Sequence, residues 1–478
     1  MTAPRHESPL GSRYASDAMV ELWGPARRAG LWRRLWLALA ETQRDLGLAI
    51  PAEAIAQMRA HLDDADLEAV RGHERRLRHD VMAHIHHFGE QAPAARPFLH
   101  LGATSCYVTD NADLIVMRDA CRLLLGRLHA LLGALREQAE RHAALPTVAY
   151  THFQPAQLTT VGKRVTLWLQ DFALDAEALL GVDAHLPFRG CKGTTGTQAS
   201  FLELFDGDEG RVRELDRRVA AAFAFSESCP VTGQTYTRKI DARVLDAWAG
   251  IAQSASKFGT DLRLLQHEGE LFEPAEADQV GSSAMPYKRN PMRAERLCAL
   301  SRYLIALREN TAYTAATQWL ERSLDDSANR RLVLPDGALA ADAILVLAAD
   351  VARGLEVREG TIGRNVERAM PFMATERWLM LAVRAGGDRQ TVHELMRRHS
   401  WDVVAALERG GPNDLLDRLA AEPPFAGVDA AALRAQLDPI RYVGRAPAQV
   451  TEYLREHVGP LLTRLAPYAP TDQPGVRV

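Results

Sequence analysis

The chain has 478 residues, of which 47% are hydrophobic and 25% charged, so it can bury an apolar core, and its length favours two or three domains. A formal net charge of −4 excludes the strong basic excess of a nucleic-acid-binding protein, and we expect no nucleic-acid partner. We also expect a cytoplasmic protein without a membrane segment or a zinc site, because the chain lacks a signal peptide, an apolar run of about 18 residues and paired cysteine motifs.

The first hundred residues predict helices separated by polar loops. An apolar helical face extends from Leu31 to Leu48, and a helical pattern with acidic residues on its outer side covers 52–70. Four histidines then follow within nine residues, at positions 79, 84, 86 and 87. They fall on two faces of a helix and lack the HExxH arrangement, so we expect no metal site here.

Long helical patterns fill the middle of the chain. Residues 101–111 predict a turn before a helix of about 30 residues, with Asp110 or Asn111 as its N-cap. Strand-like alternation is scarce, and comparable helical patterns recur at 157–182, 241–270, 292–318 and 337–355. We therefore predict an all-α fold with three helical domains, the central one a long-helix bundle, and the predicted boundaries are 1–104, 105–357 and 358–478.

Several predicted helices are apolar on more than one face, as in residues 338–349. A helix that is apolar all round must be buried, and in an elongated bundle another subunit often covers it. The sequence therefore favours a symmetric oligomer. After about residue 357 the glycine and proline breaks multiply, which predicts the shorter helices of the third domain.

Lysine is rare in this chain, with only five among the 57 basic residues. All five lie in one central span, at positions 163, 192, 239, 257 and 288. A retained lysine indicates either a site that needs a compact ammonium or simple chance, and for Lys257, inside a helical pattern, we favour chance. Lys288 lies in the polar loop 281–291, where two prolines interrupt the helix and Gly, Ser, Arg and Asn accompany it.

This loop, GSSAMPYKRNP, resembles the signature loop of the fumarase/aspartase superfamily, whose members eliminate a group β to a carboxylate and release fumarate. The stretch YKRNPMR at 287–293, which continues this loop, is similar to that of the adenylosuccinate lyase family, in the animal-type subgroup. The resemblance covers nearly the whole chain. Its other matching blocks are residues 101–111, 151–157, 192–198, 232–239 and 324–331.

The resemblance implies a reaction that breaks a succinyl C–N bond. Such a step needs a base for a proton beside one carboxylate, an acid for the departing nitrogen, and fixed donors for the charge that develops. By resemblance the acid is His152, whose imidazole titrates near neutrality, and the base is Ser282, with Lys288 as the nearby catalytic cation. A free serine hydroxyl is a very poor base, so chemistry alone does not select Ser282.

The resemblance also implies the residues that bind the substrate. The fumaryl carboxylates would contact Thr104, Ser105, Lys288 and Asn290. The other implied binding residues are Arg13, Tyr14, Arg78, His79, Asp80, Gln234, Arg296, Arg322, Ser327 and Arg331. The implied substrates are succinyl-purine nucleotides, namely adenylosuccinate and succinylated aminoimidazole carboxamide ribotide. The implied enzyme is a homotetramer with active sites shared between subunits, without cofactor or metal.

Two other functions stay open at this point. One is a paralogous lyase of a specialised pathway that acts on a related succinyl-amino nucleoside or nucleotide. The other, which we rank lower, is a non-catalytic structural helical oligomer. The intact residues His152, Ser282 and Lys288 argue against the structural protein, and comparing turnover on the two purine substrates would test the paralogue.

Overall fold

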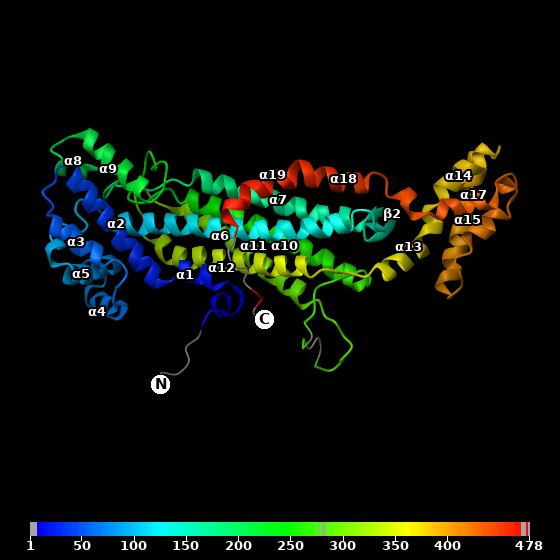
Figure 1. Ribbon diagram of the computed structural model, residues 1–478, viewed down its shortest axis with the longest axis horizontal. Helices are drawn as coiled ribbons and strands as arrows, with labels where there is room; N and C mark the ends of the chain where they lie inside the picture. Colours follow the sequence, from blue (N-terminus) through cyan, green and yellow to red (C-terminus); the bar gives the residue numbers. More distant parts are fainter. Residues whose placement is uncertain (1–6, 277, 280–282, 470–474, 477–478) are drawn as a thin grey trace.

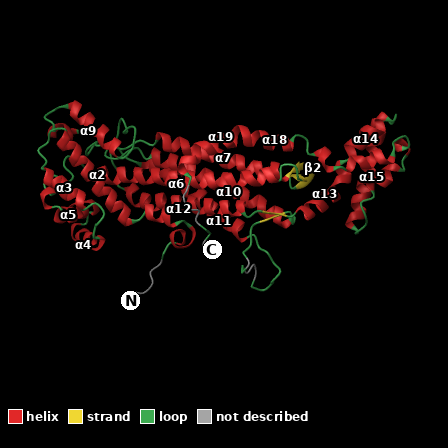
Figure 2. Cartoon of the chain, in the orientation of Figure 1, coloured by secondary structure: helices red, strands yellow, loops and turns green. Residues whose placement is uncertain are grey.

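The computed structural model describes residues 7–276, 278–279, 283–469 and 475–476. Figure 1 shows an elongated molecule, in which long helices run side by side along the long axis and groups of shorter helices lie at both ends. The fold is mostly helical, as predicted, but it also contains two small antiparallel sheets of two strands each (Figure 2).

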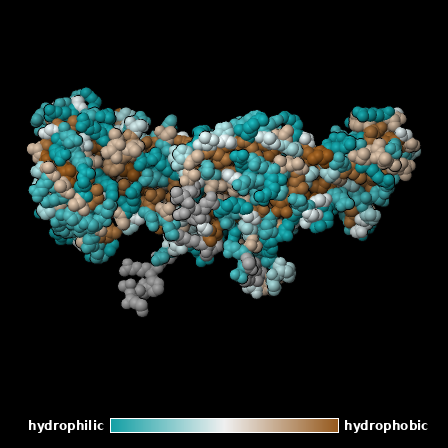
Figure 3. All heavy atoms as spheres, viewed as in Figure 1, coloured by the Kyte–Doolittle hydropathy of each residue, from teal (hydrophilic) through white to brown (hydrophobic). Residues whose placement is uncertain are grey.

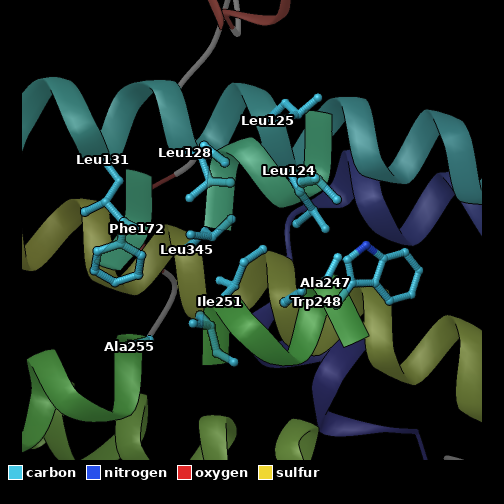
Figure 4. Close-up of a cluster of buried hydrophobic side chains, with 14 of the residues drawn as sticks. Leu124, Leu125, Leu128, Leu131, Phe172, Ala247, Trp248, Ile251, Ala255 and Leu345 are labelled. Atoms are coloured by element: carbon cyan, nitrogen blue, oxygen red, sulfur yellow. The ribbon is translucent and has the colours of Figure 1, made fainter. Parts of the chain in front are cut away.

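The central bundle consists of five long helices that pack against one another over much of their length. These helices are α6 (Ser105–Arg141), α7 (Val161–His185), α10 (Lys239–His267), α11 (Met292–Thr317) and α12 (Asp325–Arg353). Figure 4 shows their shared core, where Leu124, Leu128, Phe172 and Ile251 meet. Each such buried side chain contributes about 1.5–3 kcal/mol, so the apolar stripes are what hold the bundle together.

The N-terminal end of the bundle is covered by short helices. The chain begins with the π-helical turn η1 (Leu10–Tyr14), followed by α1 (Asp17–Leu22), α2 (Pro25–Asp45), α3 (Ala52–Ala60), α4 (Leu67–Leu77), α5 (Asp80–Gln91) and the 3-10 turn η2 (Pro93–Ala95). The predicted helix over 52–70 is thus divided in two. Asp66 explains the break, because its side chain accepts from the backbone N–H groups of Glu68 and Ala69 and caps α4. Helices α8 (Ala199–Leu204) and α9 (Glu209–Ala222) lie at the same end (Figure 1).

The helix predicted over 157–182 starts later than expected, because a β-hairpin precedes it. Strands β1 (Pro146–Thr151) and β2 (Gln154–Thr160) pair in antiparallel register, and α7 begins at Val161. The Thr160 side chain caps α7 by accepting from the Lys163 backbone N–H at 3.1 Å. The second sheet pairs β3 (Leu271–Phe272) with β4 (Glu356–Val357) beside the loop that leads into α11.

The predicted N-cap of the long helix α6 was wrong. The cap is Thr104, and Asp110 and Asn111 lie inside the helix, fully buried. Both polar side chains have partners across the bundle, and Asn111 Nδ2 also donates to the Tyr107 carbonyl of its own helix at 2.8 Å. Asn111 exchanges hydrogen bonds with the backbone of Gly190, and Asp110 pairs with Arg238.

The C-terminal part first forms a group of short helices at the far end of the bundle and then turns back. The group contains α13 (Glu359–Met373), α14 (Thr375–Arg384), α15 (Arg389–Glu408), α16 (Leu415–Ala420), α17 (Ala430–Arg434), and the 3-10 turns η3 (Pro423–Phe425), η4 (Ala435–Leu437) and η5 (Pro439–Tyr442). The chain then returns along α7 and α6 through α18 (Ala446–Tyr453), η6 (Leu454–Val458), α19 (Gly459–Leu465) and η7 (Ala466–Tyr468) (Figure 1). The predicted third domain, 358–478, therefore includes helices that pack on the central bundle, and the three-domain division stays a prediction.

Helix α12 is the one described helix that is long and apolar enough to cross a membrane by length and composition. Its most apolar window is 78% buried inside the structure. A core helix passes the same test, so a single helix of this kind is weak evidence for a membrane segment.

Candidate functional site

A cavity of about 1070 Å³ opens between the N-terminal helices and the near ends of α6 and α12. Its size lies at the upper end of the range for small-molecule sites, large enough for a nucleotide. Nine residues predicted to bind substrate line it together. They are Arg78, His79, Asp80, Thr104, Ser105, Gln234, Arg322, Ser327 and Arg331.

Two helix N-termini border this cavity. Arg78 ends α4 in the left-handed conformation (φ 54°), and His79 is the N-cap of α5, accepting from the Met82 backbone N–H through Nδ1. Because Nδ1 accepts, Nε2 carries the proton in neutral His79, and it lies 3.4 Å from Ser105 Oγ in the first turn of α6. The positive ends of α5 and α6 thus favour an anionic ligand.

The Gln234 amide is held in a defined orientation at the cavity wall. Its Nε2 lies 3.4 Å from Thr104 Oγ1, and its Oε1 accepts weakly from the Cys106 thiol at 3.9 Å. The buried Arg189 guanidinium donates to the Gln234 carbonyl, which holds the backbone as well. Gln234 is therefore a placed polar group and not a mobile surface amide.

A buried ion network forms part of the cavity wall and was not predicted from the sequence. Arg238 donates through Nη1 and Nη2 to Asp110 at 3.1 and 3.2 Å and through Nε to Asp326 at 2.7 Å. Burial alone would raise the pKa of Asp110, but the Arg238 and Arg330 cations outweigh it and hold that pKa below its ordinary value. Arg330 in turn pairs with Asp241 at 2.7 Å.

The sequence contained a signal for this network. Asp110, Arg238, Asp326 and Arg330 all lie within segments that resemble the superfamily, yet none belonged to the predicted site. Of the four, Asp110 lies inside a largely apolar helical stripe, and a charged residue buried there must find a partner. That rule does not say which partner it takes, and it does not select the other three, which lie in polar segments.

Six predicted residues lie outside this cavity. His152 occupies the turn of the β1–β2 hairpin, at the opposite end of the bundle from α5 (Figure 1). Lys288 and Asn290 belong to the segment before α11, and Arg13 and Tyr14 to η1. Arg296, on α11, lies near η1, with its guanidinium carbon 5.9 Å from the centre of the Tyr14 ring. Ser282 falls outside the described residues.

The backbone at His152 is strained. Thr151 pairs with Gln154, so His152 and Phe153 are the central residues of a two-residue turn, with φ of 52° and 56°. Both values lie in the left-handed region, which Gly and Asn usually occupy, and each costs other residues on the order of 1 kcal/mol. The His152 side chain is exposed at this tip. Because the side chain is exposed, packing in the core does not account for a histidine at this strained position.

The other histidines of the 79–87 segment have separate surroundings. His84 packs edge-on against Trp32, and burial lowers its pKa to about 4. His86 stacks on His73, and His87 accepts from the Asp66 backbone N–H. Among the residues that the structure describes, no group of three or more His, Cys, Asp or Glu is arranged to hold a metal ion.

Family models match most of this chain. Residues 46–304 match the lyase family model, and residues 371–453 match the model of the adenylosuccinate lyase C-terminus. The adenylosuccinate lyase of Schizosaccharomyces pombe is 46% identical over 96% of this chain and 95% of its own length. The corresponding enzyme of Saccharomyces cerevisiae is 45% identical over 98% of both chains.

Solved structures share the fold at lower identity. The 3-carboxy-cis,cis-muconate lactonizing enzyme from Pseudomonas putida superposes with a TM-score of 0.81 at 23% identity, over 96% of this chain and 99% of its own. The fumarate lyase from Mesorhizobium sp. BNC1 superposes with a TM-score of 0.79 at 24% identity, over 95% of this chain and 100% of its own. The fold, the two family models and the high identity to the yeast enzymes agree, and the chain belongs to the adenylosuccinate lyase family of the fumarase/aspartase superfamily.

Proposed function

We propose that this protein is an adenylosuccinate lyase, which cleaves adenylosuccinate into AMP and fumarate and also releases fumarate from succinylated aminoimidazole carboxamide ribotide. The observation that carries the proposal is the cavity, where two helix N-termini, three of the predicted arginines, three predicted hydroxyls and an amide from distant parts of the chain converge. A nucleotide with a phosphate and two carboxylates needs this combination of cations and fixed donors.

The phosphate is proposed to bind between Arg322, Ser327 and Arg331 at the start of α12. Arg331 keeps more than half of its side chain exposed, so its guanidinium is accessible to a ligand. Thr104 and Ser105 would donate to a fumaryl carboxylate, since both lie at the positive end of α6. Arg78, His79 and Asp80 close the wall opposite α12.

The proposed reaction removes a proton from the carbon beside one carboxylate and breaks the neighbouring C–N bond. The electron pair of the C–H bond forms the C=C bond of fumarate. The amino nitrogen of the nucleotide leaves with the electrons of the C–N bond. His152 supplies the proton that neutralises this nitrogen, and Ser282 accepts the carbon-bound proton. Lys288 and Asn290 stabilise the carboxylate as negative charge builds on it.

The same proposal requires more than one subunit. His152 and the cavity lie at opposite ends of the bundle, so they can act on one substrate only if they come from different chains (Figure 1). Large apolar side chains are exposed along the long helices, among them Leu174 at 63%, Leu332 at 68% and Tyr313 at 69%. Figure 3 shows hydrophobic residues along the side of the bundle. A symmetric homotetramer would cover these surfaces and complete each site.

The activity is tested with the purified protein and both substrates. Loss of the succinyl-nucleotide absorbance with equimolar fumarate release on adenylosuccinate supports the proposal. Turnover on neither purine substrate would contradict it, and activity on a succinylated nucleoside alone would favour the specialised paralogue. We also propose a cytoplasmic location, in keeping with the five cysteines, all free and buried.

A further inference from the structure

The turn before α12 carries Arg322, and the first turn of that helix supplies its acceptor. Arg322 Nη1 donates to the two oxygens of Asp326 at 2.8 and 2.9 Å. The Asp326 side chain is fully buried, whereas 22% of the Arg322 side chain is exposed at the cavity. Within the described part of the chain, no acceptor contacts Arg322 Nη2 or Nε, so these donors are available to a ligand.

Asp326 has a second partner, but that partner does not depend on it. Arg238 donates to Asp326 through Nε at 2.7 Å, and its other two nitrogens are held by both oxygens of Asp110. If Asp326 were neutral, Arg238 would still have a buried carboxylate in bidentate contact. The buried ion network in the cavity wall therefore keeps its main ion pair without Asp326.

The backbone around Arg322 offers little to hold a long side chain. In the turn 318–324, Trp319 is 74% exposed and Leu320 is 98% exposed. The turn is tied to the rest of the site by the Gln234 backbone N–H, which donates to the Glu321 carbonyl at 2.9 Å. An arginine on such a turn would sample many rotamers, and binding would have to order it.

We propose that Asp326 is a positioning residue that holds the Arg322 guanidinium ready for the substrate phosphate, so that the ordering takes place on folding and not on binding. The proposal rests on the proposed function, in which Arg322 contacts that phosphate. Asp326 does not touch the ligand itself. It turns Nη1 toward the core, which leaves Nη2 and Nε for the cavity.

The test compares Asp326→Asn with Asp325→Asn, the same change one residue earlier. Asp325 is exposed and accepts from Ser323 and Gln318, away from the cavity. Asp326→Asn should raise KM for adenylosuccinate about 3- to 10-fold, the cost of ordering one long side chain, with kcat changed by less than about 2-fold. Asp325→Asn should leave both unchanged. An unchanged or lower KM in Asp326→Asn, or an equal rise in Asp325→Asn, would overturn the proposal.

A second measurement separates positioning from general stability. In the Arg322→Ala background, Asp326→Asn should raise KM no further, because the residue through which it acts is gone. A full additional increase would show that Asp326 acts by another route. If Asp326→Asn does not fold, Asp326→Glu keeps the charge beside Arg238 but shifts the carboxylate, and the same rise in KM is expected.

Failure of the proposed function can be distinguished from failure of the positioning role. If the wild type does not cleave adenylosuccinate, that function is wrong whatever the variants do. AMP binding, measured by calorimetry on the same proteins, still tests the positioning role. Asp326→Asn should bind AMP more weakly than the wild type by the same 3- to 10-fold factor, on the order expected for one ordered side chain. Equal AMP binding by Asp326→Asn and the wild type would overturn the inference.

Discussion

Arg331 Nη2 lies 2.5 Å from Asp80 Oδ2, which joins α12 to the first residue of α5 across 251 positions of the chain. The Arg331 side chain is 56% exposed, and an ion pair this open stabilises a fold by only about 0–1 kcal/mol. The contact therefore adds little to stability, and its main effect is to hold the Arg331 side chain at the cavity wall. In the proposed function, the substrate phosphate replaces Asp80 as the partner of Arg331.

Replacing Arg331 tests the phosphate contact. Arg331→Ala should raise KM for adenylosuccinate about 10-fold or more and change kcat little, because it removes a contact that substrate and transition state share. Steady-state kinetics with the nucleotide and with its dephosphorylated form provide the measurement. The two losses should not add, since both remove one interaction. Fully additive losses would mean that Arg331 contacts another part of the substrate.

Replacing His152 tests the proposed acid. His152→Asn should lower kcat by about 100-fold or more, because asparagine cannot donate a proton as imidazolium does. Asparagine also accepts the left-handed conformation of this turn, so the hairpin should remain folded. His185→Asn, an exposed histidine at the end of α7, is the matched control and should be fully active. Near-normal turnover of His152→Asn would contradict the assignment.

Two lysines allow a test of shape at constant charge. Lys288→Arg should reduce kcat/KM by about 10-fold or more, because a larger, planar guanidinium does not fit a site shaped for a compact ammonium. Lys257→Arg serves as the control, since Lys257 is half-exposed on α10 and pairs with Asp261 at 2.6 Å. Equal activity of both variants would show that Lys288 is not selected for its shape.

Asp175 predicts a pH dependence of stability. It is buried between α7 and α10, and burial raises its pKa from 3.8 to about 7. The folded protein then binds this proton more tightly than the unfolded chain does, so stability is lost as pH rises from about 4 to about 7. Asp175→Asn removes this loss and should stabilise the protein above pH 7 by at most about 4 kcal/mol.

Melting temperatures across this pH range measure the effect of Asp175. The stability gain of Asp175→Asn should shrink as pH falls, and it should vanish below about pH 4, where the wild-type carboxyl becomes protonated in the unfolded chain as well. Asp206→Asn is the control, because Asp206 is exposed and its left-handed backbone suits asparagine. A gain that is independent of pH would mean that Asp175 is not ionised near neutrality.

Mixing two inactive variants tests the shared site. His152→Ala and Ser282→Ala proteins should each be nearly inactive, and random reassembly should restore roughly a quarter of wild-type activity, because each site draws its two residues from independent subunits. A charged tag on one of the two variants separates mixed tetramers from the parents by charge and verifies that they have formed. Mixed tetramers that stay inactive would place both residues on one chain, or exclude them as the catalytic pair.

The sequence by itself determined the long helices, because apolar residues recur along them with the helical period over many turns. It also identified nine of the residues that line the cavity, because the resemblance to the superfamily implies them. It did not reveal the β1–β2 hairpin, whose short strands carry no clear alternation and whose turn has His152 and Phe153 in place of Asn and Gly.

Only the tertiary structure decided which charges meet. Asp110 resembles an N-cap in the sequence, but it pairs with Arg238, 128 positions away, and Asp326 holds Arg322 in the same network. Such partners depend on how α6, α10 and α12 pack, which local patterns do not encode. The structure also separated His152 from the cavity by the length of the bundle, because long helices keep their two ends far apart.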